Sequence, residues 1–423
     1  MLDLKFVREN AEAVRENCKN RGVPADVDLV LRLAGERSGL TQDLNELRQT
    51  QNQLAKRLGK ERDPEAREKL ITESRKRKEI IPQKEARLGA VEGRLREEML
   101  KIPNMTHPNA PIGKDDTENI ELRREGSIPD FGFEPRDHVE LGETLNIIDF
   151  DSGAKVAGSK FYFLRGDAVL LELGLIRYAL DILIEHSYEP TTTPDLARDE
   201  ALIGTGFIPR GPETQIYSIE NVDLSLIATA EITLAGSLAD KIVDDERLPI
   251  RLAGLSHCFR TEAGSHGRAS RGLYRVHQFT KVEMFAFTIP EQSEEMHEEM
   301  LSIEEEIFRG LGIPYRVVDI CTGDLGGAAY RKYDLEAWMP GRNAYGEVTS
   351  TSNTTDYQAR RLAIRYRREG GRPQLLHTLN GTAIAVSRAL IALIENYQRE
   401  DGSIAVPETL VPYLGKKVLK PVG

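Results

Sequence analysis

Polar and aromatic side chains alternate with apolar ones in two short runs of the sequence, LSHCFRTE and HQFTKVEMF. Arg260 and Glu262 stand two residues apart, as do Phe279, Lys281 and Glu283 along the second run. Side chains two apart in a β-strand point to one face, so each run presents these groups together. A guanidinium grips phosphate oxygens through two parallel hydrogen bonds, and a flat apolar ring matches adenine. Arg260 and Phe279 are therefore candidates for binding a nucleotide.

The two runs flank a polar segment, residues 263–274, which is rich in Gly, Ser and Arg. We interpret the whole as a β-hairpin with a long loop. Short strands with few intervening helices from 248 to 287, and helical periods at 167–187 and 382–397, predict an α+β domain built on an antiparallel sheet. The alternation by itself also fits a solvent-facing ladder of paired charges.

A stretch from Asp28 to Ile102 is rich in Leu, Glu, Lys, Arg and Gln, the composition of an exposed helical element. Gly59 and Pro64 break it into two halves. Each half carries a heptad seam: Leu40, Leu44, Leu47, Gln51, Leu54 and Leu58, then Ile81, Lys84, Leu88, Val91 and Leu95. The pattern predicts an antiparallel helical hairpin, each arm on the order of 45 Å long. A parallel dimeric coiled coil is the alternative.

The outer part of this hairpin is basic in a chain whose net charge is −11. Between residues 56 and 78, ten basic side chains stand against five acidic ones, a net charge of +5. Such a charge run is ordinarily a solvated surface, but a basic tip on a long lever also suits a phosphate backbone away from the main body. The tip has no aromatic residue, so it would read shape and phosphate and would not stack on bases.

Composition excludes several classes of protein. The 423 residues are 40% hydrophobic and 30% charged, enough for more than one core. Cys18, Cys258 and Cys321 lie far apart, which argues against a disulfide framework and a cysteine-rich zinc site. Charges interrupt the apolar residues at the N-terminus, and no stretch approaches the ~18 apolar residues of a membrane span. We expect a cytoplasmic protein without membrane contact.

Residues 103–126 are dense in Pro, Asn, Gly and Asp, a linker composition. We predict a helical domain at 1–102, a linker at 103–126 and an α+β domain at 127–423. No P-loop or dinucleotide fingerprint occurs, so a nucleotide would bind by another route. His257, His266 and His277 lack the spacing of a helical metal-binding pair, and we expect them to be structural or solvent-facing.

Several motifs together resemble one family. FRTEAG with RGLYRVHQFTKVEMF is similar to motif 2 of the class II aminoacyl-tRNA synthetases, in the form carried by seryl-tRNA synthetases. LNGTAIAVSRALIALIENYQ, which contains Arg388, resembles motif 3, and Pro194 in EPTTTPDL fits the motif 1 proline at the dimer contact. TAE at 229–231, KYDLEAWMP at 332–340 and the helical hairpin also resemble that family, in order along essentially the whole chain.

The resemblance implies a homodimer in which a coiled-coil arm precedes a class II catalytic domain, an antiparallel β-sheet flanked by helices. The implied reaction joins serine and ATP into seryl adenylate and pyrophosphate, then moves the seryl group to the 3′ adenosine of tRNA(Ser). Whether tRNA(Sec) is also charged stays open. Two anions approach each other in the first step, so cationic groups and Mg²⁺ are needed where charge builds. Neither a covalent nucleophile nor a zinc site is implied.

The resemblance also assigns roles to residues. Arg260, Arg388 and Glu347 would be catalytic, with Arg260 on the α-phosphate and the serine carboxylate, and with adenine between Phe279 and Arg388. The full ATP set would be Arg260, Thr261, Glu262, Phe279, Glu347, Val348, Thr349, Ser350 and Arg388, of which Glu347 and Ser350 would also hold magnesium. Serine would contact Thr229, Ala230, Glu231, Arg260, Glu283 and Thr382. The tRNA contacts would be Lys56, Arg57, Lys60, Arg75, Lys76, Arg77 and Lys78.

Thr349 and Thr351 stand where many family members have Ser and Cys, so we expect altered packing there and retained activity. A site built around the serine hydroxyl would reject alanine strongly, whereas threonine would need steric exclusion. Two other functions stay open: a paralogue that activates serine for an acceptor other than tRNA, and a non-catalytic binding protein on the same scaffold. The basic hairpin argues against the first, and the retained ATP-gripping residues argue against the second.

Overall fold

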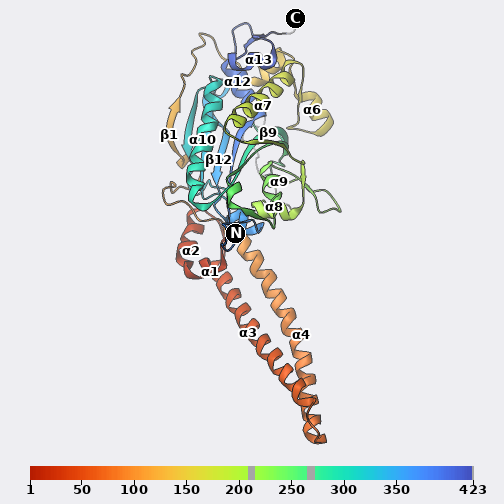
Figure 1. Ribbon diagram of the computed structural model, residues 1–423. Helices are drawn as coiled ribbons and strands as arrows, with labels where there is room; N and C mark the ends of the chain where they lie inside the picture. The colour runs from red at the N-terminus through yellow and green to blue at the C-terminus, as the bar shows by residue number, and fades with distance from the viewer. Residues whose placement is uncertain (208–214, 264–271, 422–423) are drawn as a thin grey trace. The chain divides into compact units, whose positions relative to one another are not determined.

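The computed structural model describes residues 1–207, 215–263 and 272–421 (Figure 1). Over these residues the chain divides into two compact units, Met1–Pro103 and Asn104–Gly423. The first unit is helical and the second combines a large sheet with helices, which confirms the predicted α+β class. No helix in the described ranges is both long enough and apolar enough to cross a membrane.

The described first unit consists of α1 (Leu4–Glu9), α2 (Ala11–Asn20), α3 (Val27–Leu58) and α4 (Pro64–Lys101). The break between α3 and α4 lies where the sequence predicts it. The carboxylate of Asp63 accepts a hydrogen bond from Ala66 N–H at 2.9 Å, which satisfies one of the free donors at the start of α4. Pro64 occupies the first turn, where its missing N–H costs nothing.

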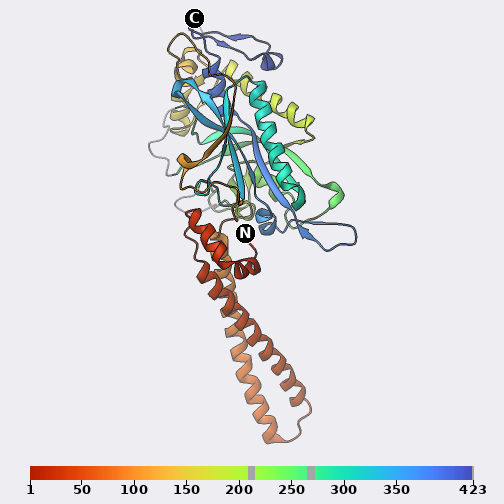
Figure 2. The same ribbon diagram turned by 90° about the vertical axis from the view of Figure 1, so that its left-hand side faces the viewer.

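The two long helices run side by side in opposite directions (Figures 1 and 2). Ion pairs join them, from Arg48 to Glu85 at 2.6 Å and from Arg37 to Glu92 at 3.2 Å. The least exposed seam residues are Leu44, Leu54, Val91 and Leu95. The heptad positions therefore pair within one chain. This confirms the helical hairpin and not the parallel dimeric coiled coil.

The structure differs from the linker predicted at 103–126. Asn104 is buried in the second unit, where its side-chain amide donates to Thr354 O at 2.8 Å. Ile120–Glu125 forms strand β1, which pairs with β10 (Tyr315–Asp319). Loop-forming residues mark the turns of this segment, but the backbone of its strand pairs with residues 190 or more positions away, as in Arg124 with Arg316. No local pattern reveals such partners.

In the described part of the second unit, eight strands form one sheet in the order β1-β10-β11-β12-β15-β9-β8-β4. Neighbours pair antiparallel except β4 with β8, which are parallel. The strands not yet given are β4 (Glu189–Thr192), β8 (Ile250–Phe259), β9 (Gln278–Thr288), β11 (Arg331–Met339), β12 (Ala344–Asn353) and β15 (His377–Ala385). The hairpin predicted at 248–287 is the β8–β9 pair; most of its loop lies outside the described residues.

Helices α7 (Asp167–Glu185), α10 (Ser293–Gly310) and α12 (Val386–Asn396) pack on one face of this sheet (Figure 1). Val282 and Met284 of β9 join their core. Phe285 and Phe287 point the other way and pack with α9 (Glu231–Gly236) and α11 (Tyr357–Arg361). Strict alternation along β9 therefore gives both faces an apolar anchor.

Shorter elements complete the described second unit. Its other helices are α5 (His138–Thr144), α6 (Phe150–Ala157), α8 (Asp199–Thr205) and α13 (Val411–Leu414). A small sheet joins β7 (Ile242–Asp244), β13 (Arg365–Arg367) and β14 (Gln374–Leu375). Three two-stranded ribbons pair β2 (Ile148–Asp149) with β3 (Phe163–Leu164), β5 (Leu196–Ala197) with β6 (Ser225–Leu226), and β16 (Ile404–Ala405) with β17 (Val418–Leu419).

Candidate functional site

Strand β9 supplies the polar row predicted from its alternation. Phe279, Lys281 and Glu283 line cavities on the face that carries α9, whereas Val282 and Met284 are buried under the helices of the opposite face. Arg260 follows the last residue of β8 and stays paired with the returning strand, its backbone N–H donating to His277 O at 3.0 Å. These polar residues line a concave site, so they are not a solvent-facing ladder.

A β-bulge decides which residues of β12 face the site. Leu335 pairs with Thr349, but the next residue of β11, Glu336, pairs with Glu347, so Val348 is the extra residue. Glu347 and Ser350 consequently line the same cavity although they are three apart. Val348 is 1% exposed and joins the core under the helices, and Thr349 donates from its hydroxyl to Glu304 Oε2 of α10 at 2.8 Å.

Thr351 shares the orientation of Thr349. Its hydroxyl donates to Asn380 O at 3.0 Å and lies 3.8 Å from the sulfur of Met300 on α10. Glu304 is fully buried, and burial raises its pKa well above the ordinary range. Among the described residues its Oε1 has no hydrogen-bond partner. The two threonines therefore act on the packing of β12 against α10.

The residues predicted to bind serine come together around a cavity of about 430 Å³. Lys281 Nζ donates to Thr229 Oγ1 at 2.8 Å and forms an ion pair with Glu283. Thr382 donates to Glu283 Oε2 at 3.4 Å. Glu231 at the start of α9 shares this cavity, whereas Ala230 is buried in the core beneath.

Two amides orient the Glu231 carboxylate. Gln358 Nε2 of α11 donates to Glu231 Oε1 at 2.6 Å, and Asn380 Nδ2 of β15 donates to the same oxygen at 3.0 Å. Burial and, next, the charge of Glu283 raise the pKa of Glu231 to about 7, against the hydrogen bond from Gln358. Burial likewise raises the pKa of Glu283, with Lys281 opposing. Two carboxyls poised in this way favour a ligand that brings a positive charge.

A second, smaller part of the site lies beside Phe279. The guanidinium of Arg260 lies 5.3 Å from the Phe279 ring centre, and Glu262 accepts from Arg275 Nη1 at 3.2 Å. Arg388 of α12 pairs with Glu347 Oε1 at 3.0 Å. This part is lined by both arginines, Phe279 and Glu347. Thr261, whose N–H donates to Gln215 O at 3.1 Å, lies between Arg260 and Glu262 in the chain.

Three cations set the charge of Glu347. Its partial burial opposes ionisation, but Arg388, Lys332 and Arg260 outweigh that cost and lower the pKa of Glu347 to about 2. The carboxylate is therefore charged at neutral pH. Together the positive groups create a pocket that attracts polyanions and keeps the charged Glu347 carboxylate among them.

The resemblance assigned no role to several residues that the structure places in or beside the site. Lys332 and Asp334 of β11 lie opposite Ser352 and Ser350 of β12, and Lys332 Nζ pairs with Asp334 at 3.0 Å. The alternation of polar residues in the run KYDLE already indicates that Lys332 and Asp334 share one face of a strand. Other additions are Tyr274, Arg342, Gln358 and Asn380. Their local sequences do not predict this role, because each residue comes from a different element and reaches the site only in the folded chain.

Of the histidines considered as metal ligands, His257 pairs with Asp195 Oδ2 at 2.9 Å and His277 Nδ1 lies 2.8 Å from Arg260 O. His266 lies outside the described residues. Within the described ranges, no group of three or more His, Cys, Asp or Glu side chains could hold a metal ion.

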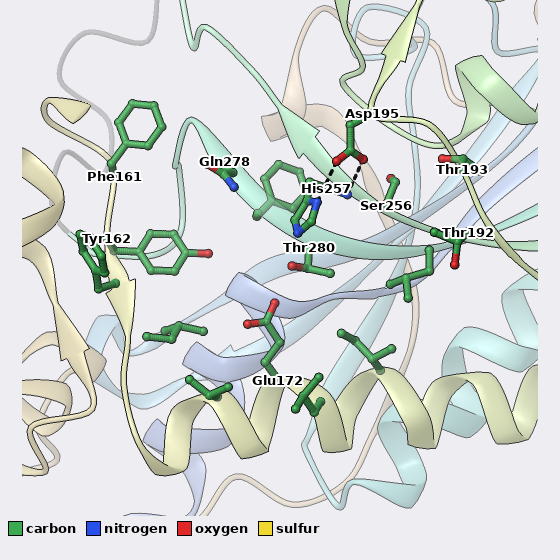
Figure 3. A pocket seen from close by; sticks show the side chains of 17 residues that line it. Phe161, Tyr162, Glu172, Thr192, Thr193, Asp195, Ser256, His257, Gln278 and Thr280 are labelled. Atoms are coloured by element: carbon green, nitrogen blue, oxygen red, sulfur yellow. Dashed lines mark hydrogen bonds and ion pairs between the residues drawn. The ribbon is translucent and has the colours of Figure 1, made fainter. Parts of the chain in front are cut away.

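A further cavity of the second unit, with a volume of about 610 Å³, lies on the other side of Phe279 (Figure 3). Thr192, Asp195 and His257 form one wall, and Glu172 rises from α7 below them. Apolar residues of α7 also line it, including Leu173, which is 57% exposed. Pro194, the predicted dimer-contact proline, lies between Thr193 and Asp195 of the same wall.

In the helical unit, the predicted basic tip is at the surface. Lys56, Arg57, Lys60, Arg75, Lys76 and Lys78 are exposed, and Arg77 is half-buried and pairs with Glu73 at 2.7 Å. The charges thus remain available to a polyanion.

Comparison with known proteins agrees with this geometry. Residues 216–397 match the class II tRNA synthetase core domain (G, H, P, S and T), and residues 1–106 match the seryl-tRNA synthetase N-terminal domain. The serine–tRNA ligase of Rubrobacter xylanophilus is 75% identical over 421 residues, covering 100% of this chain and 99% of that protein. That of Treponema denticola is 56% identical, covering 98% and 99%. This chain belongs to the seryl-tRNA synthetase family.

The solved structure of a seryl-tRNA synthetase from Pyrococcus horikoshii, complexed with ATP, superimposes with a TM-score of 0.93 at 42% identity and covers 100% of both chains. Every residue predicted for ATP and serine lies inside the matched core domain, and the basic tip lies inside the matched N-terminal domain. The seryl-tRNA synthetase resemblance identified from the motifs is therefore confirmed over the full length.

Proposed function

We propose that this protein is a serine–tRNA ligase. In the first step a serine carboxylate oxygen attacks the α-phosphorus of ATP, the bond to the bridging oxygen breaks, and pyrophosphate leaves. In the second step the terminal hydroxyl of tRNA attacks the seryl carbonyl, AMP leaves, and the hydroxyl proton is released. The observation that carries the proposal is one site that joins a small, cationic, aromatic-lined pocket to a larger one lined by the buried carboxyls of Glu231 and Glu283.

The acidic pocket fits the amino end of serine. Glu283 and Glu231 would balance its ammonium ion, and Thr382 would contact its hydroxyl group. Thr229 would keep Lys281 and the loop before α9 in place through the 2.8 Å hydrogen bond. Alanine would leave the hydroxyl-facing groups unpaired, and this is the strongest kind of discrimination available to a binding site.

The cationic pocket fits ATP. Arg260 would hold the α-phosphate and the serine carboxylate, which brings two anions together only because the guanidinium offsets their charge. Glu262 would accept a hydrogen bond from adenine, and Phe279 and Arg388 would cover the two faces of its ring. Thr261 and the backbone of Val348 and Thr349 would complete the walls.

Glu347 and Ser350 would hold Mg²⁺. Two oxygen groups are enough, because magnesium keeps several waters and takes its remaining ligands from substrate phosphates. The low pKa of Glu347, about 2, keeps one of these ligands charged. The ion would supply positive charge to the phosphate oxygens.

The hairpin tip would bind tRNA(Ser). Its exposed cations, Lys56, Arg57, Lys60, Arg75, Lys76, Arg77 and Lys78, suit the phosphates of a helical RNA arm. The chain would work in the cytoplasm, where tRNA, ATP and serine meet.

The protein would act as a homodimer. Val169, Leu170 and Leu173 of α7 are exposed apolar residues, and two of them line the cavity of Figure 3. A patch of this kind beside Pro194 is suited to contact with a second copy. Sedimentation equilibrium should give twice the chain mass; a monomer at micromolar concentration would refute this part.

The decisive test is serine-dependent exchange of labelled pyrophosphate into ATP without tRNA, with alanine, threonine and cysteine compared at equal concentration. Strong exchange with serine alone is expected. A folded protein that exchanges with none of them would contradict the proposal. Aminoacylation of tRNA(Ser) and tRNA(Sec) transcripts then identifies the acceptor, and activation without charging either would favour another acceptor.

A further inference from the structure

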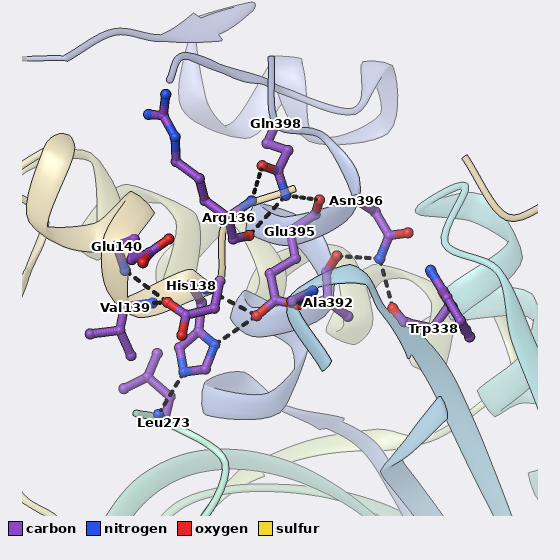
Figure 4. Close-up of polar contacts among 12 residues, drawn as sticks. Arg136, His138, Val139, Glu140, Leu273, Trp338, Ala392, Glu395, Asn396 and Gln398 are labelled. Carbon is purple, nitrogen blue, oxygen red and sulfur yellow. Dashed lines mark hydrogen bonds and ion pairs between the residues drawn. The ribbon is translucent and has the colours of Figure 1, made fainter. Parts of the chain in front are cut away.

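A buried carboxylate at the end of α12 accepts three hydrogen bonds from two other segments (Figure 4). Glu395 Oε1 lies 3.0 Å from the backbone N of His138 and 2.8 Å from its Nδ1. Glu395 Oε2 accepts from the backbone N–H of Gly341 at 2.9 Å. The side chain of Glu395 is 0% exposed and that of His138 is 8% exposed. The carboxylate is therefore fully committed to these donors.

The second ring nitrogen of His138 reaches the loop that returns to β9. Leu273 N–H donates to His138 Nε2 at 3.1 Å (Figure 4). A backbone N–H can only donate, so Nε2 carries the lone pair and Nδ1 carries the proton that is given to Glu395. A side chain at Gly272 would collide with this imidazole. The imidazole thus bridges Glu395 and Leu273 through two hydrogen bonds, so the position of Leu273 depends on that of Glu395.

Both chains of contact end at one aromatic residue of the candidate ATP pocket. Tyr274 follows Leu273, and its carbonyl oxygen accepts from Arg388 Nε at 3.4 Å. Arg388 lies 4.7 Å from the Tyr274 ring centre, and Arg342, which follows Gly341, lies 4.5 Å from it. Tyr274 is therefore contacted by both arginines, and the residues that precede Tyr274 and Arg342, namely Leu273 and Gly341, are held by the His138–Glu395 pair.

We propose that His138 and Glu395 are positioning residues for ATP: the pair fixes Leu273 and Gly341, and thereby sets Tyr274 and Arg342 against Arg388. Neither residue lines the described pockets, so they act through Tyr274 and Arg388 and not by touching substrate. Arg388 and Glu395 lie on the same helix, α12. This helix therefore carries both the guanidinium proposed to cover adenine and the carboxylate that holds His138 and Gly341. The inference rests on the proposed activation of serine by ATP.

The test compares two replacements of one histidine. In His138→Asn the amide nitrogen can still donate to Glu395, but no acceptor reaches Leu273 N–H. In His138→Gln the amide oxygen lies near the former Nε2 and can accept from Leu273. The control is His186→Asn, which removes another histidine–carboxylate pair, His186 with Glu306 at 2.8 Å, neither of which lines these pockets.

KM for ATP and KM for serine are measured separately by pyrophosphate exchange, with thermal unfolding as a check of folding. His138→Asn should raise KM for ATP about tenfold, the effect of one lost buried hydrogen bond, and leave KM for serine within about twofold. His138→Gln should restore most of the loss, and His186→Asn should change neither constant. Glu395→Gln, which replaces one acceptor by a donor, should also raise KM for ATP alone, and it serves if the asparagine variant does not fold.

An unchanged KM for ATP, an equal rise in both KM values, or a glutamine variant no better than asparagine would overturn the positioning role. Instability without an ATP-selective change would mean that the pair only holds the fold together. The unsubstituted protein separates the two proposals: if it exchanges no pyrophosphate with serine, the proposed function itself fails.

Discussion

Contacts across the helical hairpin join two consecutive helices, whereas several contacts in the candidate site join segments far apart in the chain. Gln51 and Ser74 meet across the hairpin at a separation of 23 residues. Asn380 and Glu231 meet in the site at a separation of 149. The hairpin's ion pairs are also exposed and individually weak, while the Lys281–Glu283 pair of the site is buried and costly to break. Changes in the site should therefore act on chemistry, and changes in the hairpin on binding of the acceptor alone.

The sharpest test of this contrast is Arg260→Ala. It removes the charge that offsets the approach of two anions, so serine-dependent exchange should fall about a thousandfold or more. Circular dichroism and the unfolding temperature should stay close to those of the parent, because Arg260 is half-buried and belongs to no core cluster. Arg316→Ala, which removes a surface pair with Glu336, is the matched control and should keep full exchange. A collapsed fold in Arg260→Ala would make this arginine a structural residue.

The hairpin can be shortened without disturbing its base. Asp43 pairs with Lys84, so removing residues 47–80 and joining 46 to 81 by a short Gly–Ser turn keeps the register below the cut. tRNA charging should fall about a hundredfold because the phosphate contacts are lost. Exchange without tRNA should stay within about twofold of the parent. Equal loss of both activities would contradict the division of labour between the two units.

Serine binding should depend on pH. Burial raises the pKa of Glu231 to about 7, so this carboxyl is protonated below that pH and charged above it. The serine ammonium favours the charged form. KM for serine should therefore fall about tenfold as pH rises from 6 to 8, because the charged fraction of a carboxyl with a pKa of about 7 rises about tenfold over this range. Glu231→Gln should show a flat profile and a higher KM at pH 8. A parent profile as flat as the variant's would exclude Glu231 from this role.

The smallest expected effect concerns stability. Burial raises the pKa of Glu304 in the folded protein, so its contribution to stability is complete below the pKa of an unfolded glutamate, about 4.3, and is lost as pH rises toward the folded pKa. Glu304→Gln should remove this dependence and raise the unfolding temperature at pH 8 by about 2–4 °C. Scanning calorimetry at pH 5 and pH 8 measures it. A parent unfolding temperature that falls no further than the variant's between these pH values would show that Glu304 does not titrate.

Much of the fold could be predicted from periodicity. The heptad seams, the Gly–Pro break and the alternation along β9 each follow from local geometry, and each confirmed prediction depends on residues within a few positions of one another. The segment predicted as a linker could not be predicted in this way, because β1 is exposed along its whole length and its sequence shows no alternation of buried and exposed residues. Its strand character comes from the partner β10, which follows it by nearly 200 residues.

The same limit applies to the site. Alternation alone assigns Phe279, Lys281 and Glu283 to one face, and family motifs supply the remaining expected residues. No pattern in β12 reveals the bulge at Val348, which turns Glu347 toward the site and leaves Thr349 against Glu304. Tyr274 and Asn380 were missed for a similar reason, since each becomes a site residue only through elements distant in the chain.

By itself the sequence determined the family, the helical hairpin with its basic tip, and the face of β9 that carries Phe279, Lys281 and Glu283, because these depend on residue type and short-range period. Only the tertiary structure decided the register of β12, the pairing of β1, and the His138–Glu395 contacts that end at Tyr274. These features depend on hydrogen bonds between segments far apart in the chain. Such partners depend on the packing of the whole sheet, so they cannot be predicted from the local sequence.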